Sequence, residues 1–365
     1  MFKRGPRFRP EDVWIANYLG ALSAIDGGIT TMLDWSQIQN TPQHSDAAVD
    51  ALRRSGIRAV FGHGWSLTEG DSRTPNSSRA HPADIARLRR EQFSTDDSLL
   101  TLVMAARGPE ITNGETWQAD LRLARELGIR SSIHMGAFPF NGQKQGIAEM
   151  QKHGMLGEDL TFVHCNCSAD DELQMIADHG ITVSLGVAVE MNATGLGDVP
   201  IDRLLAVGLR PSLSGDTETL GTADMFTQMR FLLQTHRALA NDTFHQQETM
   251  PDRLSMTAKQ VLEYATIRSA QCIGLDRQIG SITPGKQADL ILLRKSDINM
   301  RAAADPVSSI VLHAGVSNVD TVMIRGKLVK QHGKLLYRDL GRRLQELDRS
   351  SQRLYAGFRS HASAA

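Results

Sequence analysis

Two histidines and one aspartate lie at the ends of three short apolar stretches of the sequence. His134 closes IRSSIH, His164 follows TFV, and Asp216 closes LRPSLSGD. Each stretch has the composition of a buried strand, and parallel strands end at one rim of their sheet, so the three side chains are expected to gather there. Imidazoles and a carboxylate so placed can hold a metal ion that activates water. A single histidine at the end of a strand is more typical of a structural role. Three residues of these types, each at the end of its own strand, favour a functional site.

Strands and helices must alternate to bring these ends together, and the sequence alternates in this way up to residue 216. Amphipathic helices separate the apolar stretches, which indicates a parallel sheet. Residue types suited to catalysis at several strand ends favour a (β/α)₈ barrel, of the TIM type, over a doubly wound sheet. The predicted strands are 29–34, 57–62, 99–105, 129–134, 161–164, 181–186 and 209–216. The chain opens with a helix at 11–26 rather than a strand, so the strand missing from the barrel is the first.

A second group of elements follows the last predicted barrel strand. Helices are expected from Leu220 and from Met256, and GSITPGKQADLILLR, residues 280–294, is typical of a turn followed by a strand. Further short strands are expected within 319–337, and an amphipathic helix within 339–359. We therefore predict a barrel carrying strands two to eight at residues 1–275, an accessory β-segment that resembles part of a sandwich at 276–338, and a C-terminal helix and tail at 339–365.

The composition narrows the class of protein. Forty Lys and Arg residues balance 41 Asp and Glu residues, so the charge gives no reason to expect nucleic acid or an anionic membrane as a partner. No apolar run approaches the length of a transmembrane helix, and the basic start has no apolar segment of a secretory signal. Three cysteines cannot form a disulfide framework. We predict a cytoplasmic protein that acts on a small molecule, with homo-oligomerisation left open.

Four segments together resemble the amidohydrolase superfamily, in its cytosine deaminase and chlorohydrolase branch. They are IRSSIHMG, VHCN, SLSGD and the late GSITPGKQADLILL. The resemblance implies a metal-dependent barrel that hydrolyses C–N or similar bonds of small ring or amide substrates, with one divalent metal, zinc or iron. It also implies that His134 ligates the metal, that His164 ligates it or contacts substrate, and that Asp216 ligates it and shuttles protons. A bound metal would lower the pKa of water and supply hydroxide for the attack.

The sequence departs from the family pattern in two places. The family begins with an H-x-H pair after strand one, and no H-x-H occurs among the twelve histidines here. This gap coincides with the missing strand, so we interpret the chain as an N-terminally truncated form or the product of a shortened gene. The second departure is Ala137, which stands where deaminases of this branch carry a glutamate. Glu110 or Glu190 is the candidate substitute for it, although each also fits a surface or packing role.

Two residues that follow other strands are candidates for the pocket rim. Trp35 and His63 come after strands two and three and could contact substrate, and Trp35 could equally cap the barrel. A zinc shared by His164 and Cys165 is disfavoured, because alternation along a strand places neighbouring side chains on opposite faces. A cysteine nucleophile is also disfavoured, since nothing near these cysteines in the sequence would lower a thiol pKa.

Two hypotheses remain open. The first is an amidohydrolase-type, deaminase-like enzyme that attacks a C–N bond with hydroxide held on its metal. The second is a catalytically inactive, truncated barrel with a structural or regulatory role. In either case seven strands leave two open sheet edges, so we expect poor solubility or pairing with another chain.

Overall fold

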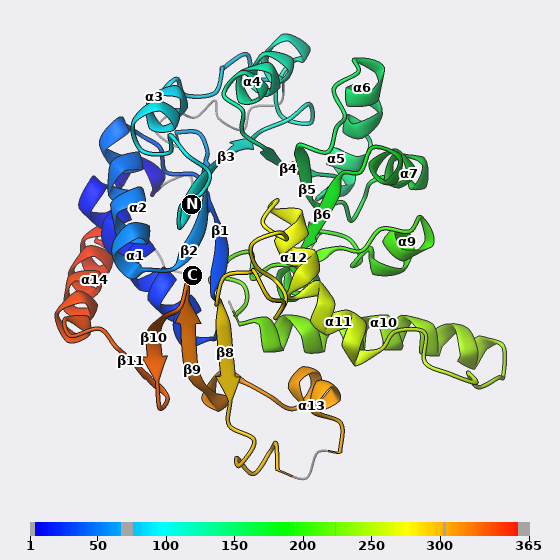
Figure 1. Ribbon diagram of the computed structural model, residues 1–365. Helices are drawn as coiled ribbons and strands as arrows, with labels where there is room; N and C mark the ends of the chain where they lie inside the picture. The colour runs from blue at the N-terminus through cyan, green and yellow to red at the C-terminus, as the bar shows by residue number, and fades with distance from the viewer. Residues whose placement is uncertain (1–3, 67–75, 194, 223, 302–303, 357–365) are drawn as a thin grey trace, which may run out of the picture.

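The computed structural model describes residues 4–66, 76–193, 195–222, 224–301 and 304–356. Its centre is a parallel sheet of seven strands that curls into a half-barrel (Figure 1). The strands lie side by side in chain order, which confirms the predicted number and sequence of barrel strands. They are β1 Thr31–Ser36, β2 Arg58–His63, β3 Leu100–Ala106, β4 Ser131–Met135, β5 Leu160–His164, β6 Thr182–Leu185 and β7 Ser212–Leu213.

Helices follow the strands and bury their apolar stripes against the outside of this sheet. Asn113 caps one of them by accepting a hydrogen bond from the Thr116 amide, and Gly56 ends another with a φ of 71° that favours glycine. The α-helices up to the last sheet strand are α1 Pro10–Asp26, α2 Pro42–Ser55, α3 Asp84–Glu91, α4 Gly114–Glu126, α5 Pro139–Gly142, α6 Gly146–Lys152, α7 Asp170–Asp178, α8 Val187–Asn192 and α9 Ile201–Ala206.

The elements beyond β7 form a second group. Four strands make an antiparallel sheet in the order β11-β10-β9-β8, as the late turn and strand pattern indicates. The strands are β8 Leu290–Leu293, β9 Val319–Ile324, β10 Lys327–Gln331 and β11 Lys334–Leu335. The helices of this group are α10 Met225–Gln246, α11 Ala258–Tyr264, α12 Ile267–Cys272, α13 Pro306–Leu312 and α14 Leu340–Tyr355, and a 3₁₀ turn covers Val316–Asn318. Another 3₁₀ turn, Gly5–Arg7, precedes α1.

Two buried polar contacts fasten this second group to the half-barrel. Arg58 of β2 donates from Nε to Asp289 at 2.7 Å, and both side chains are almost fully buried. Ser350 of α14 donates to Asp12 of α1 at 2.7 Å, so the last described helix packs against the first. Each contact joins residues that are more than 200 positions apart in the chain. The two contacts therefore attach the C-terminal elements to the N-terminal part of the half-barrel.

Some predicted boundaries were wrong. The strand expected at 209–216 shortens to two residues in β7, and Pro211, which has no amide hydrogen to donate, directly precedes it. The single helix expected from Met256 divides into α11 and α12 around Thr266, whose backbone is not helical. Helix α8 was not predicted because its six residues are too few to show a helical period. No helix among the described residues is long and apolar enough to cross a membrane.

Candidate functional site

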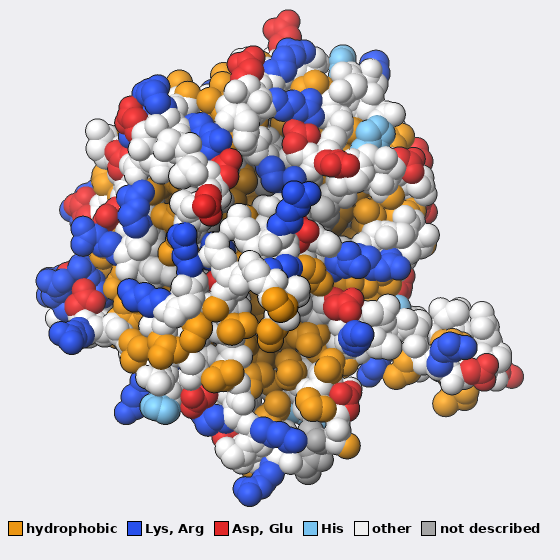
Figure 2. All heavy atoms as spheres, in the orientation of Figure 1, with side chains coloured by type: hydrophobic (Ala, Val, Ile, Leu, Met, Phe, Trp, Pro, Cys, Tyr) orange, Lys and Arg blue, Asp and Glu red, His pale blue; other side chains and the backbone are white. Residues whose placement is uncertain are grey.

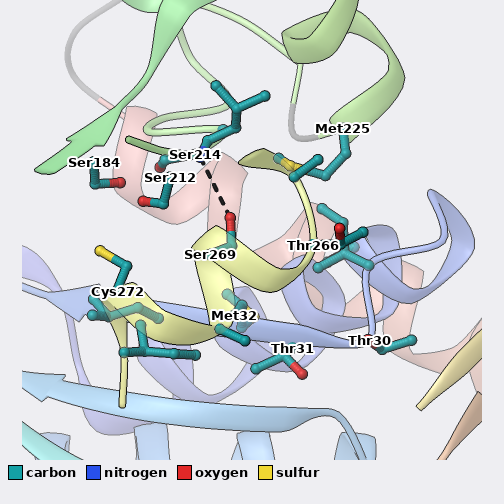
Figure 3. Close-up of a pocket in the computed structure, with 18 of the residues that line it drawn as sticks. Thr30, Thr31, Met32, Ser184, Ser212, Ser214, Met225, Thr266, Ser269 and Cys272 are labelled. Carbon is teal, nitrogen blue, oxygen red and sulfur yellow. Dashed lines mark hydrogen bonds between the residues drawn. The ribbon is translucent and has the colours of Figure 1, made fainter. Parts of the chain in front are cut away.

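A cavity of about 620 Å³ opens between the two outer strands of the half-barrel, β1 and β7. Trp35, His134 and Asp216 line one end of it, at the carboxyl ends of their strands. Small hydroxyl side chains from the interior face of the sheet line the middle, and Figure 3 labels Ser184 and Ser212 among them. Carboxyl ends of barrel strands are where catalytic residues lie in this architecture, so this end of the cavity is the candidate active site.

Trp35 and His134 form one wall of the site. The indole Nε1 of Trp35 donates to Ser132 Oγ at 2.9 Å, which fixes the ring across the end of β4. Its edge meets the ring of His134 with centroids 4.3 Å apart and planes 87° apart. The ring of His134 lies 5.3 Å from that of His164, so the two strand-end histidines are neighbours as predicted from their positions.

His164 is held between two carboxylates. Its Nδ1 lies 3.0 Å from Glu190 Oε1 and its Nε2 lies 4.0 Å from Asp216 Oδ2. The Glu190 oxygen also accepts the Gly186 amide hydrogen at 3.0 Å, and the Glu190 side chain is buried. Because the carboxylate of Glu190 accepts, Nδ1 carries the hydrogen, and Nε2 of His164 is directed toward Asp216.

The backbone is bent where these side chains leave their strands. His164 and Asp216 have φ values of 76° and 54°, in the left-handed region that side chains other than glycine seldom adopt. Gly186 permits the approach of Asp216, since a Cβ at this glycine would lie 2.7 Å from the Asp216 Cβ. Cys165 is also left-handed, with a φ of 60°. The strand alternation used to separate Cys165 from His164 therefore stops at His164, where β5 ends, and Cys165 is buried in the hydrophobic core.

Electrostatics favour a charged His164. Burial alone lowers its pKa, but the hydrogen bond to Glu190 and the charges of Glu190 and Asp216 outweigh this and raise it. Burial raises the pKa of Asp216, against the lowering by His164. Burial also raises the pKa of Glu190, and we place the shared proton on the imidazole because Glu190 accepts a second hydrogen bond from Gly186. A carboxyl group with a raised pKa beside a proton donor suits proton transfer.

The three predicted metal ligands have the chemistry of a zinc or iron site, with two imidazoles and one carboxylate. His134 and Asp216 line the cavity, and His164 lies beside it, with its Nε2 4.0 Å from Asp216. The separation of the His134 and His164 rings is compatible with a shared ion. Within the described ranges, however, no group of three His, Cys, Asp or Glu side chains is arranged to hold a metal. His134, His164 and Asp216 therefore supply donors for a metal without forming a complete cage.

The other predicted site residues lie away from the cavity or have another role. Glu110 is buried behind β4, where its Oε1 accepts the Gly136 amide hydrogen at 2.8 Å, and burial raises its pKa to about 7. His63 is buried with its Nδ1 3.0 Å from His81 Nε2, and burial lowers its pKa to about 4. Neither residue lines the cavity. Glu190 contacts His164 and does not line the cavity.

Sequence reasoning missed the partner of His164 and the hydroxyl groups of the cavity wall. Glu190 is 26 positions from His164 and lies on a short helix, so no local pattern connects the two residues. Ser132, Ser184 and Ser212 do have a signal, because each is a small polar residue at an inward position of a strand and precedes an apolar residue. Such small polar residues inside a barrel leave room for a cavity.

Fold and site together define a barrel-type hydrolase with catalytic residue types at the carboxyl ends of a parallel sheet. The chain belongs to the amidohydrolase family, whose profile, described as "Amidohydrolase family", matches residues 7–329. The proteins it resembles are named as deaminases and triazine hydrolases. Solved structures of two of them contain zinc.

Three relatives show the extent of the likeness. A 5′-deoxyadenosine deaminase of Methanopyrus kandleri is 26% identical over 331 residues, which are 88% of this chain and 71% of the relative. An adenosine deaminase of Xanthomonas campestris, solved with bound zinc, superposes with a TM-score of 0.81 at 20% identity over 95% of this chain and 76% of its own. Atrazine chlorohydrolase of Arthrobacter aurescens, also solved with zinc, gives a TM-score of 0.77 at 18% identity over 95% and 78%.

Proposed function

We propose that the protein hydrolyses a C–N bond, outside peptides, in a small cyclic or amide-like substrate. The observation that carries this proposal is the pairing of His164 Nε2 with Asp216 Oδ2 across 4.0 Å, at the end of the cavity that Asp216, His134 and Trp35 line. Relatives named as deaminases of adenosine and 5′-deoxyadenosine support purine nucleosides as the first substrate class to test.

Each residue of the site has a role in this reaction. Asp216 takes a proton from the attacking water and passes it to the leaving nitrogen, for which its raised pKa is suited. His164, charged and held by Glu190, donates from Nε2 to the substrate atom on which negative charge develops. Trp35 forms an apolar wall against which a ring can lie. A divalent metal held by His134 and Asp216 would lower the pKa of water at the site, and His164 would be its third ligand only with Nε2 deprotonated, because Nδ1 is bound to Glu190.

The finer architecture follows from the same proposal. The seven parallel strands correspond to strands two to eight of a (β/α)₈ barrel that lacks its first strand. Residues 1–275 then form the catalytic barrel, 276–338 an accessory segment like part of a β-sandwich, and 339–365 a terminal helix and tail. The incomplete group of metal donors also keeps open the second candidate, an inactive barrel with a structural or regulatory role.

Ammonia release decides between the two candidates. The purified protein is loaded with zinc or with iron(II), and ammonia is measured with adenosine, 5′-deoxyadenosine and cytosine. We expect metal-dependent release with at least one of them, and release slower by about 10²- to 10⁴-fold from the Asp216→Asn variant. Metal stoichiometry is measured in parallel. A chain that retains no metal and releases no ammonia supports the inactive barrel, and an unchanged rate of release from Asp216→Asn contradicts the assigned mechanism.

A further inference from the structure

On the face drawn in Figure 2, acidic side chains lie at the surface among Lys and Arg side chains. Glu110, in the loop between β3 and α4, is instead buried, with 4% of its surface exposed. It does not line the cavity, so it does not touch a substrate bound there. Its Oε1 accepts the amide hydrogen of Gly136 at 2.8 Å, and Gly136 lies two residues after His134. Glu110 therefore acts on the backbone that carries His134.

Backbone hydrogen bonds join the two turns that follow the strand-end histidines. The Cys165 amide donates to the Met135 carbonyl at 2.9 Å. The Cys167 amide donates to the Gly136 carbonyl at 2.7 Å. These bonds continue the ladder of β4 and β5, whose last pair is Met135 with His164. A displacement of Gly136 would therefore move the backbone at both histidines.

Gly136 packs tightly against the second of these turns. A Cβ at this position would lie 2.3 Å from Ser168 Oγ and 2.7 Å from the Ser168 amide nitrogen. Gly136 is buried, and no other hydrogen bond from its amide occurs in the part of the chain that the structure describes. Without the Glu110 oxygen this amide would have no acceptor, and the turn would have to move to bring it to water.

The side chain of Glu110 is itself held in place. Its backbone carbonyl accepts a hydrogen bond from Lys144 Nζ. Gly146 lies so close that a Cβ there would be 2.9 Å from Glu110 Cγ. Because packing limits the conformations of this side chain, its oxygen stays at a fixed position relative to the Gly136 amide.

We infer that Glu110 is a positioning residue that sets the spacing of His134 and His164, whose rings lie 5.3 Å apart. It does so by accepting from Gly136, which fixes the two joined turns. The acceptor oxygen has this effect, so an amide group at position 110 can replace the carboxylate. The consequence for metal binding rests on the proposed function, in which both imidazoles act at one site.

Ring contacts in the metal-free protein test the inference without an assay of activity. Histidine rings are isotope-labelled, and the nuclear Overhauser effect between the rings of His134 and His164 is measured. Glu110→Met fills similar space without the oxygen and Glu110→Asp withdraws the oxygen by one carbon, so we expect both variants to lose this effect. Glu110→Gln should keep it. An unchanged effect in Glu110→Met and Glu110→Asp, or an equal loss in Glu110→Gln, overturns the inference.

Asp120 provides a matched control for loss of stability. It is a buried carboxylate of α4 that also accepts one backbone amide, that of His81, at 2.8 Å. Asp120→Leu should lower the melting temperature as Glu110→Met does and leave the contact between the two site histidines unchanged. An equal loss of that contact in Asp120→Leu would show that it follows stability, and would overturn the inference.

Zinc binding separates this inference from the proposed function. The dissociation constant of zinc is measured by competition with a chelating dye. Loss of a group that orients a metal ligand typically weakens binding about 10- to 100-fold, and we expect that change for Glu110→Met and less than about threefold for Glu110→Gln. Wild-type affinity in Glu110→Met overturns the positioning role. A wild-type protein that binds no zinc, and loses the ring contact on Glu110→Met, contradicts the proposed function and supports the positioning role.

Discussion

The carboxylate of Glu190 lies 3.0 Å from Nδ1 of His164, and both side chains are buried. Glu190→Gln keeps an oxygen that can accept from His164 and Gly186 but removes the negative charge. Burial, which lowers the pKa of His164, is then less opposed, so we expect this pKa to fall while the fold is retained. Titration of the His164 ring by NMR measures the change.

The rate of catalysis should also depend on the contact between Glu190 and His164. Loss of a residue that orients a catalytic or ligating histidine typically costs about 10- to 100-fold, and we expect Glu190→Gln to reduce kcat by that factor. Glu190→Ala also removes the hydrogen bond and should reduce it further. If both variants keep the wild-type kcat and its pH profile, Glu190 has only a packing role.

Asp216 is the residue to which the proposed reaction assigns proton transfer. Asp216→Asn removes the acid–base group, so ammonia release from the productive substrate should fall about 10²- to 10⁴-fold. Burial raises the pKa of this carboxyl, which means that its charge is costly in the folded state, and the amide should not lower the melting temperature. Kinetics and thermal unfolding of the same preparation separate a catalytic loss from a folding defect.

The sequence predicted the sheet better than it predicted the site. The order of the seven strands and the neighbouring positions of His134 and His164 follow from local periodicity and from the rule that parallel strands end at one rim. Glu190 was predicted to contact substrate, whereas its contact with His164 depends on how α8 folds back and has no signal in the sequence. The strand count implied the gap between β1 and β7 that forms the cavity. It did not imply that α12 occupies part of this gap, because the position of α12 depends on tertiary packing.

Glu110 gives stability a pH dependence that can be isolated. Burial raises its pKa from 4.5 to about 7, so the folded state binds a proton that the unfolded state releases between these values. The contribution of Glu110 to the free energy of unfolding therefore decreases as pH rises from about 4.5 to about 7, and it stays constant above about pH 7.

Glu110→Gln removes this dependence and keeps an acceptor for the Gly136 amide. We expect the variant to be more stable at pH 8 by up to about 3 kcal/mol and to equal the wild type near pH 4. Urea unfolding at both pH values measures the difference, and Glu115→Gln, at an exposed position of α4, is the matched control. An equal gain for Glu110→Gln at both pH values would show that the shifted pKa is not the cause.

Arg58 and Asp289 connect the half-barrel to the second group of elements through a buried ion pair. Asp289 accepts two hydrogen bonds from Arg58, at 2.7 and 3.1 Å, and one from the Arg325 amide at 2.8 Å. Asp289→Ala leaves the guanidinium of Arg58 buried with Gln287 as its remaining partner, at 2.6 Å. Breaking a buried pair in this way typically costs about 3 to 5 kcal/mol, and we expect that loss in the free energy of unfolding.

The control for this prediction is an ion pair between exposed side chains. Glu91 and Arg90 lie 2.7 Å apart with about half or more of each side chain exposed, so Glu91→Ala should cost less than about 1 kcal/mol. If Asp289→Ala costs as little as Glu91→Ala, the second group of elements does not depend on Arg58 for its attachment. In Asp289→Ala, the elements beyond β7 could lose protection in hydrogen exchange while the β2 and β3 amides keep theirs. That result would show that the ion pair of Arg58 and Asp289 connects two units that unfold separately.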